Sequence, residues 1–280
     1  MLKPILVTGA SSGIGEATAV LLSQKGFRVY AGARRIEKLK ALEGLGAGGI
    51  TALALDVTSE ASIDAALARI AADGATLYGL VNNAGVSVAG PIEEVPLEAW
   101  RRQFETNVFG LVAVTRKVLP AMRAARVGRI VNIGSLAGRI VSPFMGVYGS
   151  SKHAVEGLSD ALRRELRPFG IKVSVIRPGF INTPFGEQEQ EGLAPYVAEG
   201  RPYARGVAAF KAWHAKGHPT GAPPSAVAEA VLHALTATHP NARYTVPPRY
   251  IPALMMRNLL PSAVSDRIFE RVIGLNKKEA

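Results

Sequence analysis

Short apolar runs alternate with longer amphipathic stretches along most of the chain. Several of these runs contain almost no polar residue, which is typical of strands that are covered on both faces. The predicted strands are residues 5–8, 28–33, 50–56, 79–83, 129–134, 172–176 and 243–246. The predicted helices are residues 13–25, 36–42, 59–72, 97–125, 148–169 and 225–237. This alternation predicts an α/β fold, in which a single-domain, doubly wound parallel sheet of about seven strands carries helices on both faces.

One segment interrupts the alternation. Residues 180–224 are rich in Gly, Pro, Glu and Gln. Aromatic residues are spread through them, among them Tyr196, Tyr203, Phe210 and Trp213. We interpret the segment as an irregular insertion that serves as a substrate-binding lid, because disordered loops are poor in aromatic residues. A disordered surface loop is the alternative.

The C-terminal extension, residues 248–280, mixes apolar residues with several arginines. Its pattern fits a pair of amphipathic helices. Such helices cover the substrate site, pack against another subunit or lie weakly on a membrane surface. We expect them to cover the protein's own core, which is the commonest arrangement.

Composition limits the class of protein. The chain has 280 residues, of which 48% are hydrophobic and 20% charged, and this excludes a disordered chain or a membrane bundle. It contains no cysteine, which excludes disulfides and a cysteine nucleophile. The five histidines form no ligand pattern, so we predict no metal site. The N-terminus shows no signal peptide and no apolar run reaches ~20 residues, so we expect a soluble, cytoplasmic protein.

The formal net charge is +11. Nucleic-acid binding, an anionic small ligand and a solvated basic surface all produce such a balance. The Lys and Arg residues are scattered and aromatic residues do not alternate with them, so the sequence argues against nucleic acid as a partner.

A glycine-rich turn follows the first predicted strand and opens the first helix. It reads Thr8-Gly9-Ala10-Ser11-Ser12-Gly13-Ile14-Gly15. Glycines permit a tight turn and let the backbone approach a phosphate, while the free N–H groups of a helix N-terminus bind anions. Because the turn lies between a strand and a helix, we predict that it holds the pyrophosphate of a dinucleotide.

Tyr148 and Lys152 stand four residues apart in a predicted helix, so both side chains leave the same face. The spacing alone is common and does not indicate chemistry. A free tyrosine, with a pKa near ~10, is a poor base at neutral pH, but a neighbouring ammonium stabilises the phenolate and lowers that pKa. Such a pair is suited to exchange a proton with a carbonyl or alcohol oxygen.

The ordered motifs over roughly residues 4–185 resemble those of the short-chain dehydrogenase/reductase family. After the glycine turn come "NNAG" at 82–85, "ETNVFG" at 105–110, "IVNIGS" at 130–135, "YGSSK" at 148–152 and "RPGFINT" at 177–183. The resemblance implies a Rossmann fold and an oxidoreductase in which a nicotinamide carries the hydride. The chain is also similar to the branch of the family that acts on steroids and retinoids.

Four positions match the family's catalytic residues: Asn107, Ser135, Tyr148 and Lys152. The resemblance implies that Tyr148 is the general acid/base and that Ser135 holds the reacting oxygen. Lys152 would also hold the nicotinamide ribose, and Asn107 would hold a water that links Lys152 to solvent.

The second predicted strand indicates which nicotinamide is bound. NAD enzymes of this kind usually place an acid at its end, whereas here Arg34 and Arg35 follow it. The planar fork of an arginine binds a phosphate well, and Ser11 adds a hydroxyl. We therefore predict NADP(H). The alternative is that the two arginines begin a basic helix surface.

Other cofactor contacts are implied by the resemblance. Asp56 matches the family's adenine contact, and an N-cap-like role in "DVTSEAS" is the alternative. The full predicted set is Gly9, Ser11, Ser12, Gly13, Ile14, Gly15, Arg34, Arg35, Asp56, Val57, Asn83, Ala84, Gly85, Tyr148, Lys152, Pro178, Gly179, Ile181 and Thr183.

The predicted substrate positions are mostly apolar and include no carboxylate clamp. They are Ser135, Val141, Phe144, Met145, Tyr148 and Phe185, with Val86, Val88, Leu136 and Val147 nearby. They predict a hydrophobic ketone, aldehyde or alcohol, such as a steroid, retinoid or similar lipid. The resemblance further implies a homodimer or homotetramer. A non-catalytic NADP(H)-binding regulator or sensor is the alternative function.

Overall fold

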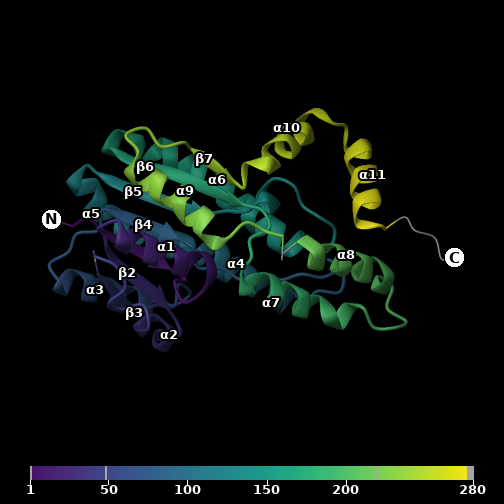
Figure 1. Cartoon of the computed structure of the whole chain (residues 1–280), viewed down its shortest axis with the longest axis horizontal. Coiled ribbons are helices and arrows are strands. Elements are labelled where there is room, and N and C mark those ends of the chain that lie inside the picture. Colours follow the sequence, from purple (N-terminus) through teal and green to yellow (C-terminus); the bar gives the residue numbers. More distant parts are fainter. Residues whose placement is uncertain (1, 48, 218–219, 276–280) are drawn as a thin grey trace.

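The computed structural model describes residues 2–47, 49–217 and 220–275. Its centre is a parallel sheet of seven strands in the order β3-β2-β1-β4-β5-β6-β7 (Figure 1). The strands are β1 Pro4–Thr8, β2 Arg28–Ala33, β3 Ile50–Ala54, β4 Gly79–Asn82, β5 Gly128–Ile133, β6 Ile171–Pro178 and β7 Arg243–Val246. The strand order reverses between β1 and β4, and the carboxyl ends of strands at such a point form a crevice for ligands.

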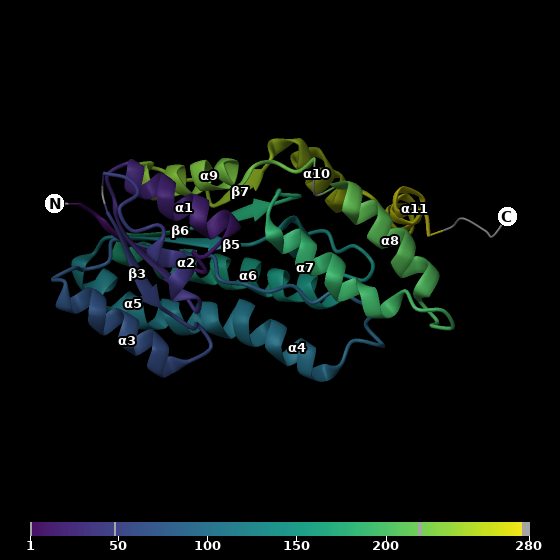
Figure 2. The same ribbon diagram turned by 60° about the horizontal axis from the view of Figure 1, so that its bottom comes forward.

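Helices cover both faces of the sheet. They are α1 Gly13–Gln24, α2 Ile36–Lys40, α3 Glu60–Ala72, α4 Leu97–Phe104, α5 Leu111–Ala125, α6 Gly146–Glu165, α7 Pro184–Leu193, α8 Ala204–Gly217, α9 Pro224–Thr236, α10 Ile251–Leu259 and α11 Ser262–Ile273. Figure 2 shows α1 and α9 on one side of the strands and α3, α5 and α6 on the other. The predicted α/β class and parallel seven-stranded sheet are confirmed.

The two faces of β1 show why the strands are so apolar. Ile5 and Val7 pack with α1 and α9, while Leu6, between them, packs with α3 and α5 on the opposite face. All three side chains are almost completely buried. A strand that is covered on both faces loses the alternation of polar and apolar residues.

The predicted helix 97–125 is wrong in one respect. A π-helical segment, Glu105–Gly110, separates α4 from α5. The wider turn accommodates one extra residue and places Asn107 inward, where its side chain bonds to the backbone of Val86.

The lid segment 180–224 was predicted to be irregular, and the structure corrects this. It folds into α7, a 3₁₀ turn Ala194–Tyr196 and α8. Leu193, Val207 and Phe210 are fully buried in a cluster that also contains Tyr148 and Met145. The aromatic residues therefore anchor two helices beyond the carboxyl ends of the strands (Figures 1 and 2).

The C-terminal extension forms α10 and α11, the expected helix pair. Phe269 and Ile273 of α11 pack onto the lid cluster. Other apolar side chains stay exposed, with Met255 at 62%, Leu259 at 77% and Ile268 at 48%, so the pair covers the core only in part. Within residues 2–47, 49–217 and 220–275, no helix is long and apolar enough to cross a bilayer.

Candidate active site

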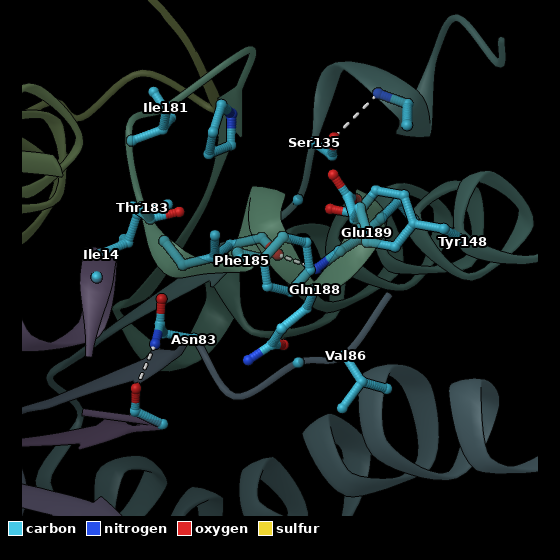
Figure 3. A pocket seen from close by; sticks show the side chains of 18 of the residues that line it. Ile14, Asn83, Val86, Ser135, Tyr148, Ile181, Thr183, Phe185, Gln188 and Glu189 are labelled. Carbon is cyan, nitrogen blue, oxygen red and sulfur yellow. Dashed lines mark hydrogen bonds between the residues drawn. The ribbon is translucent and has the colours of Figure 1, made fainter. Parts of the chain in front are cut away.

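A cavity of about 550 Å³ lies at the carboxyl ends of the strands. It runs from the glycine-rich turn after β1, past the ends of β4 and β5, to the lid helices α7 and α8. Figure 3 shows that Ser135, Tyr148, Phe185 and Glu189 come together in this cavity. The cavity thus lies between the carboxyl ends of the strands and the helices α7 and α8.

Close backbone packing fixes the shape of the glycine-rich turn. Gly9 and Gly13 adopt φ values of +66° and +58°, which favour glycine. A Cβ on Gly15 would lie 2.3 Å from the Gly9 carbonyl oxygen. Asn83 braces the turn, because its Nδ2 donates to the carbonyl oxygens of Thr8 and Gly9, both at 3.0 Å. The turn and the N-terminus of α1 therefore offer a pyrophosphate the backbone cradle that such a group requires.

Positive charge lines the end of the cavity beyond β2. Arg34 and Arg35 line it with exposed side chains, and Ser11 and Ser12 lie at the same end. Asp56 also lines it, but its Oδ1 accepts hydrogen bonds from the backbone and the hydroxyl of Thr58, at 2.9 and 2.7 Å. Asp56 thus has a structural role in the turn before α3, although the N-cap of that helix is Ser59.

Tyr148 and Lys152 occupy consecutive turns of α6 and are buried, with 8% and 6% of their surface exposed. The Lys152 ammonium lies 5.7 Å from the centre of the Tyr148 ring and donates to the Ile133 carbonyl oxygen at 2.8 Å. Ser135 follows β5, and its Oγ accepts from the Ala137 N–H at 3.1 Å, which caps the short turn Leu136–Gly138. The three side chains therefore meet at the end of β5.

The expected pKa of Tyr148 is corrected by this geometry. Burial raises the pKa of the phenol above its ordinary value, and the negative charge of Glu189 raises it further. A hydrogen bond with the Ser135 side chain acts in the opposite direction. Burial lowers the pKa of Lys152 to about 8, so its charge is itself costly in this position. The nearby Lys152 ammonium therefore does not lower the pKa of the Tyr148 phenol as predicted when no cofactor is bound.

Asn107 organises the backbone that follows β4. Its Nδ2 donates to the Val86 carbonyl oxygen at 3.0 Å, and its Oδ1 accepts from the Val86 N–H at 2.8 Å. Gln103, one helical turn earlier, pairs in the same way with the Val86 carbonyl oxygen and the Val88 N–H. Both amides lie near the Ser151 hydroxyl, which donates to the Tyr148 carbonyl oxygen. Sequence reasoning missed both residues: Gln103 lies outside the quoted motifs, and Ser151 lies inside "YGSSK" but was given no role.

Most of the predicted site residues line the cavity, but six do not. Gly15 and Asn107 do not line the cavity but pack against residues that do: Gly15 against Gly9, and Asn107 against Val86. Val88 and Val147 are buried in a separate apolar cluster with Val95 and Trp100. The other two, Val141 and Phe144, line a second, smaller cavity. The residues Val86, Leu136, Met145 and Phe185 remain as the apolar lining.

The lid contributes a buried carboxylate that sequence reasoning did not find. Glu189 of α7 is 5% exposed and lines the cavity. The pattern "EQEQEG" suggests a solvated helix face, but Gly186, Glu189 and Leu193 share the buried face at helical spacing. His214 of α8 lies beside Glu189, with its Nε2 3.1 Å from Oε2. In the described part of the chain, no group of three or more His, Asp or Glu side chains is arranged to hold a metal ion.

Comparison with known proteins gives concordant matches. The family model described as short chain dehydrogenase matches residues 3–194. The NADPH-dependent 3-dehydrocapnine reductase of Ornithobacterium rhinotracheale is 37% identical over 270 residues, covering 94% of this chain and 95% of that protein. The structure of a short-chain dehydrogenase from Streptomyces avermitilis matches with a TM-score of 0.79 and 30% identity, over 99% of this chain and 98% of that one. The structure of a short chain dehydrogenase/reductase from Burkholderia phymatum in complex with NAD matches with a TM-score of 0.79 and 27% identity, over 92% and 93%.

Proposed function

The chain belongs to the short-chain dehydrogenase family and is an oxidoreductase that acts on alcohol or carbonyl groups, and we propose that it is an NADP(H)-dependent reductase of hydrophobic carbonyl compounds with Tyr148 as its general acid. One observation carries this proposal. The side chains of Ser135, Tyr148 and Lys152 meet in a cavity whose opposite end carries a phosphate-binding turn and two arginines.

The preference for NADP(H) is supported by charge. The strand β2 ends without a carboxylate, and Arg34 and Arg35 line the cavity where the adenosine ribose of a dinucleotide would lie. A 2′-phosphate there would meet guanidinium groups, whereas NAD would leave them without an anion. Relatives and solved structures include both NADPH-dependent and NAD-bound proteins, so this specificity depends on the residues of the chain itself.

When bound, the nicotinamide supplies the hydride that reduces the carbonyl carbon. The chain supplies orientation and the proton. Ser135 and Tyr148 donate hydrogen bonds to the carbonyl oxygen, and Tyr148 transfers its proton as negative charge develops on that oxygen. Burial keeps the phenol protonated before the reaction, which suits the reducing direction. Lys152 stabilises the phenolate that remains, and the Asn107 and Gln103 amides hold the adjacent backbone in place.

The substrate is proposed to be largely apolar. Around Tyr148, the cavity is lined by Leu136, Met145, Phe185 and Phe210. The Phe185 ring lies 6.0 Å from the Tyr148 ring, so α7 places an aromatic side chain beside the phenol that would donate the proton. An aliphatic or polycyclic group fits such a lining better than a hydrophilic one does.

A homodimer or homotetramer is also proposed. Apolar side chains are exposed on α4 and the π-helical segment, with Leu97 at 62% and Phe109 at 57%. Burying such side chains against a second copy removes apolar surface from water. Light scattering of the purified chain tests this proposal, and a monomer at micromolar concentration would contradict it.

The proposed function is tested by a cofactor-paired screen. Purified protein is mixed with NADPH or NADH and a panel of aliphatic, steroid, retinoid and quinone carbonyls, and loss of the reduced nicotinamide absorbance is followed. We expect turnover of an apolar ketone or aldehyde, faster with NADPH than with NADH. NADPH binding without turnover of any carbonyl would overturn the proposed reductase, and faster turnover with NADH would overturn the cofactor assignment.

A further inference from the structure

A second cavity of about 350 Å³ lies beside the active-site cavity. Ser142 and Phe269 line both cavities, so the two spaces share part of a wall. Ser142 lies in the segment that leads into α6, whereas Phe269 belongs to α11, which lies beside the lid helix α8 (Figures 1 and 2). The C-terminal helix therefore forms part of the boundary between the active site and the second cavity.

The lining of the second cavity is mainly apolar. Its apolar side chains come from three separate parts of the chain and are Ile92, Val141, Pro143, Phe144, Phe269 and Leu275. Ile92 and Val141 are exposed, so an occupant of the cavity would remove apolar surface from water. Asp266 and Glu270 also line the cavity, and both are exposed, which places them on its solvent side. A hydrocarbon group can therefore enter without burying a charge.

One cluster of apolar side chains connects the reacting tyrosine to this cavity. Phe144, Phe210 and Phe269 pack in the cluster that contains Tyr148 and Met145. The rings of Phe144 and Phe210 lie 5.9 Å apart in an edge-to-face arrangement. Phe210 lines the active-site cavity, whereas Phe144 lines the second one. An apolar substrate chain that leaves Tyr148 along this cluster therefore stays in contact with apolar side chains as far as the second cavity.

The space beside Tyr148 is limited. The active-site cavity of about 550 Å³ has to hold the dinucleotide and the substrate together. A dinucleotide that extends from the glycine-rich turn to Tyr148 leaves only the part next to α7 and α8 for the substrate. A short ketone fits in that part, whereas a long chain needs further space, and the second cavity is the neighbouring space that shares a wall with it.

We propose that the second cavity binds the distal part of a long aliphatic chain whose carbonyl group is held by Ser135 and Tyr148. The substrate class is then a long-chain ketone or aldehyde, and the chain passes Phe269 to reach the second cavity. This inference rests on the proposed function, because it places the chain relative to the reacting carbonyl. Asp266 and Glu270 disfavour a chain that ends in a carboxylate.

Burial of methylene groups supplies the affinity for such a chain. Each methylene group that is removed from water increases the affinity by about fourfold. A chain that places several methylene groups in the second cavity should therefore bind at least about 10-fold more tightly than one that ends in the active-site cavity. Filling the second cavity with a side chain should remove this gain and leave the reacting groups in place.

The test compares 2-dodecanone with 2-hexanone, whose short chain stays in the active-site cavity. Values of kcat/KM with NADPH are measured for the wild-type protein, Val141→Trp and the control Val264→Trp. The indole at position 141 would occupy the second cavity, whereas Val264 is an exposed valine on α11 outside the lining of both cavities. We expect wild type and Val264→Trp to favour the long ketone by about 10-fold or more, and Val141→Trp to lose most of this preference. Equal kcat/KM values for the two ketones in wild type would overturn the inference, as would a preference that survives in Val141→Trp.

A measurement without turnover separates this inference from the proposed function. Calorimetry compares the binding of 2-dodecanol and of 2-hexanol to the protein saturated with NADPH. Tighter binding of 2-dodecanol by wild type, lost in Val141→Trp, supports the inference even if no carbonyl is reduced, in which case only the reductase proposal fails. Equal Kd values in wild type overturn the inference, and this outcome needs no variant, so it stands even if Val141→Trp does not fold.

Discussion

Replacing Lys152 by Met tests whether the buried ammonium destabilises the protein. Its pKa falls from 10.5 to about 8 because burial penalises the charged form. At about 1.4 kcal/mol for each pH unit, this corresponds to a penalty of roughly 3 kcal/mol at neutral pH. Met has a similar length and no charge, but it leaves the Ile133 carbonyl oxygen without the ammonium donor, which costs about 1–3 kcal/mol. The two effects nearly cancel near neutral pH, so the pH dependence is more informative than a single value.

The sign of that dependence follows from proton binding. Between pH 8 and 10.5, the unfolded chain keeps the Lys152 proton that the folded chain has lost, so wild-type stability rises with pH in this range. The stability contributed by this shift is fully present above pH 10.5 and is lost as the pH falls through about 8. From about pH 7.5 to about pH 10, we expect wild type to gain about 2 kcal/mol relative to Lys152→Met.

Urea unfolding of both proteins without added cofactor, at several pH values in this range, measures the difference directly. Other titrating groups, including Tyr148, are present in both proteins and cancel in the comparison. A difference in unfolding free energy that stays constant from about pH 7.5 to about pH 10 would refute the reasoning, because Lys152 would then titrate alike in the folded and unfolded chains.

Three further predictions concern the cofactor end and the scaffold. Arg34→Glu should weaken NADPH binding by roughly 10-fold or more and NADH binding much less, as measured by fluorescence titration. An equal loss of affinity for both cofactors would contradict the proposed contact with the 2′-phosphate. Gly15→Ala should abolish NADPH binding, because its Cβ would lie 2.3 Å from the Gly9 carbonyl oxygen, and calorimetric Kd values near wild type would show that the turn does not bind the cofactor. Gln103→Leu should lower the unfolding free energy by about 1–3 kcal/mol, since the Val88 N–H loses its partner; denaturant curves that overlay wild type would remove Gln103 from the supporting network.

Periodicity predicted the sheet well because its strands are covered on both faces. The uninterrupted apolar runs and the glycine turn are local signals that survive without tertiary information, and seven strands lie near their predicted positions. The lid was harder to predict. Gly186, Gly192 and several prolines suggested a loop, whereas the helical spacing of Val207, Phe210 and His214 carries the real signal for α8. Tertiary burial of that face adds to the stability of this alanine-rich helix.

The residues of the candidate site that belong to sequence motifs could be predicted, whereas those outside the motifs could not. Tyr148, Lys152 and Ser135 lie together because the ends of strands and the start of α6 converge. The pKa of Tyr148 was predicted in the wrong direction, because burial and Glu189 cannot be seen from the four-residue spacing. Glu189 itself was missed, since a glutamate among glutamates indicates a solvated surface until the tertiary structure buries it.

The most direct test of the proposed mechanism removes one oxygen atom. Tyr148→Phe keeps the ring that packs against Phe185 and removes only the proton donor. With the best carbonyl from the screen, we predict that kcat falls by about 10²- to 10⁴-fold while the Kd for NADPH stays within a few-fold of wild type. Turnover near the wild-type rate would show that another group supplies the proton, and would contradict the account.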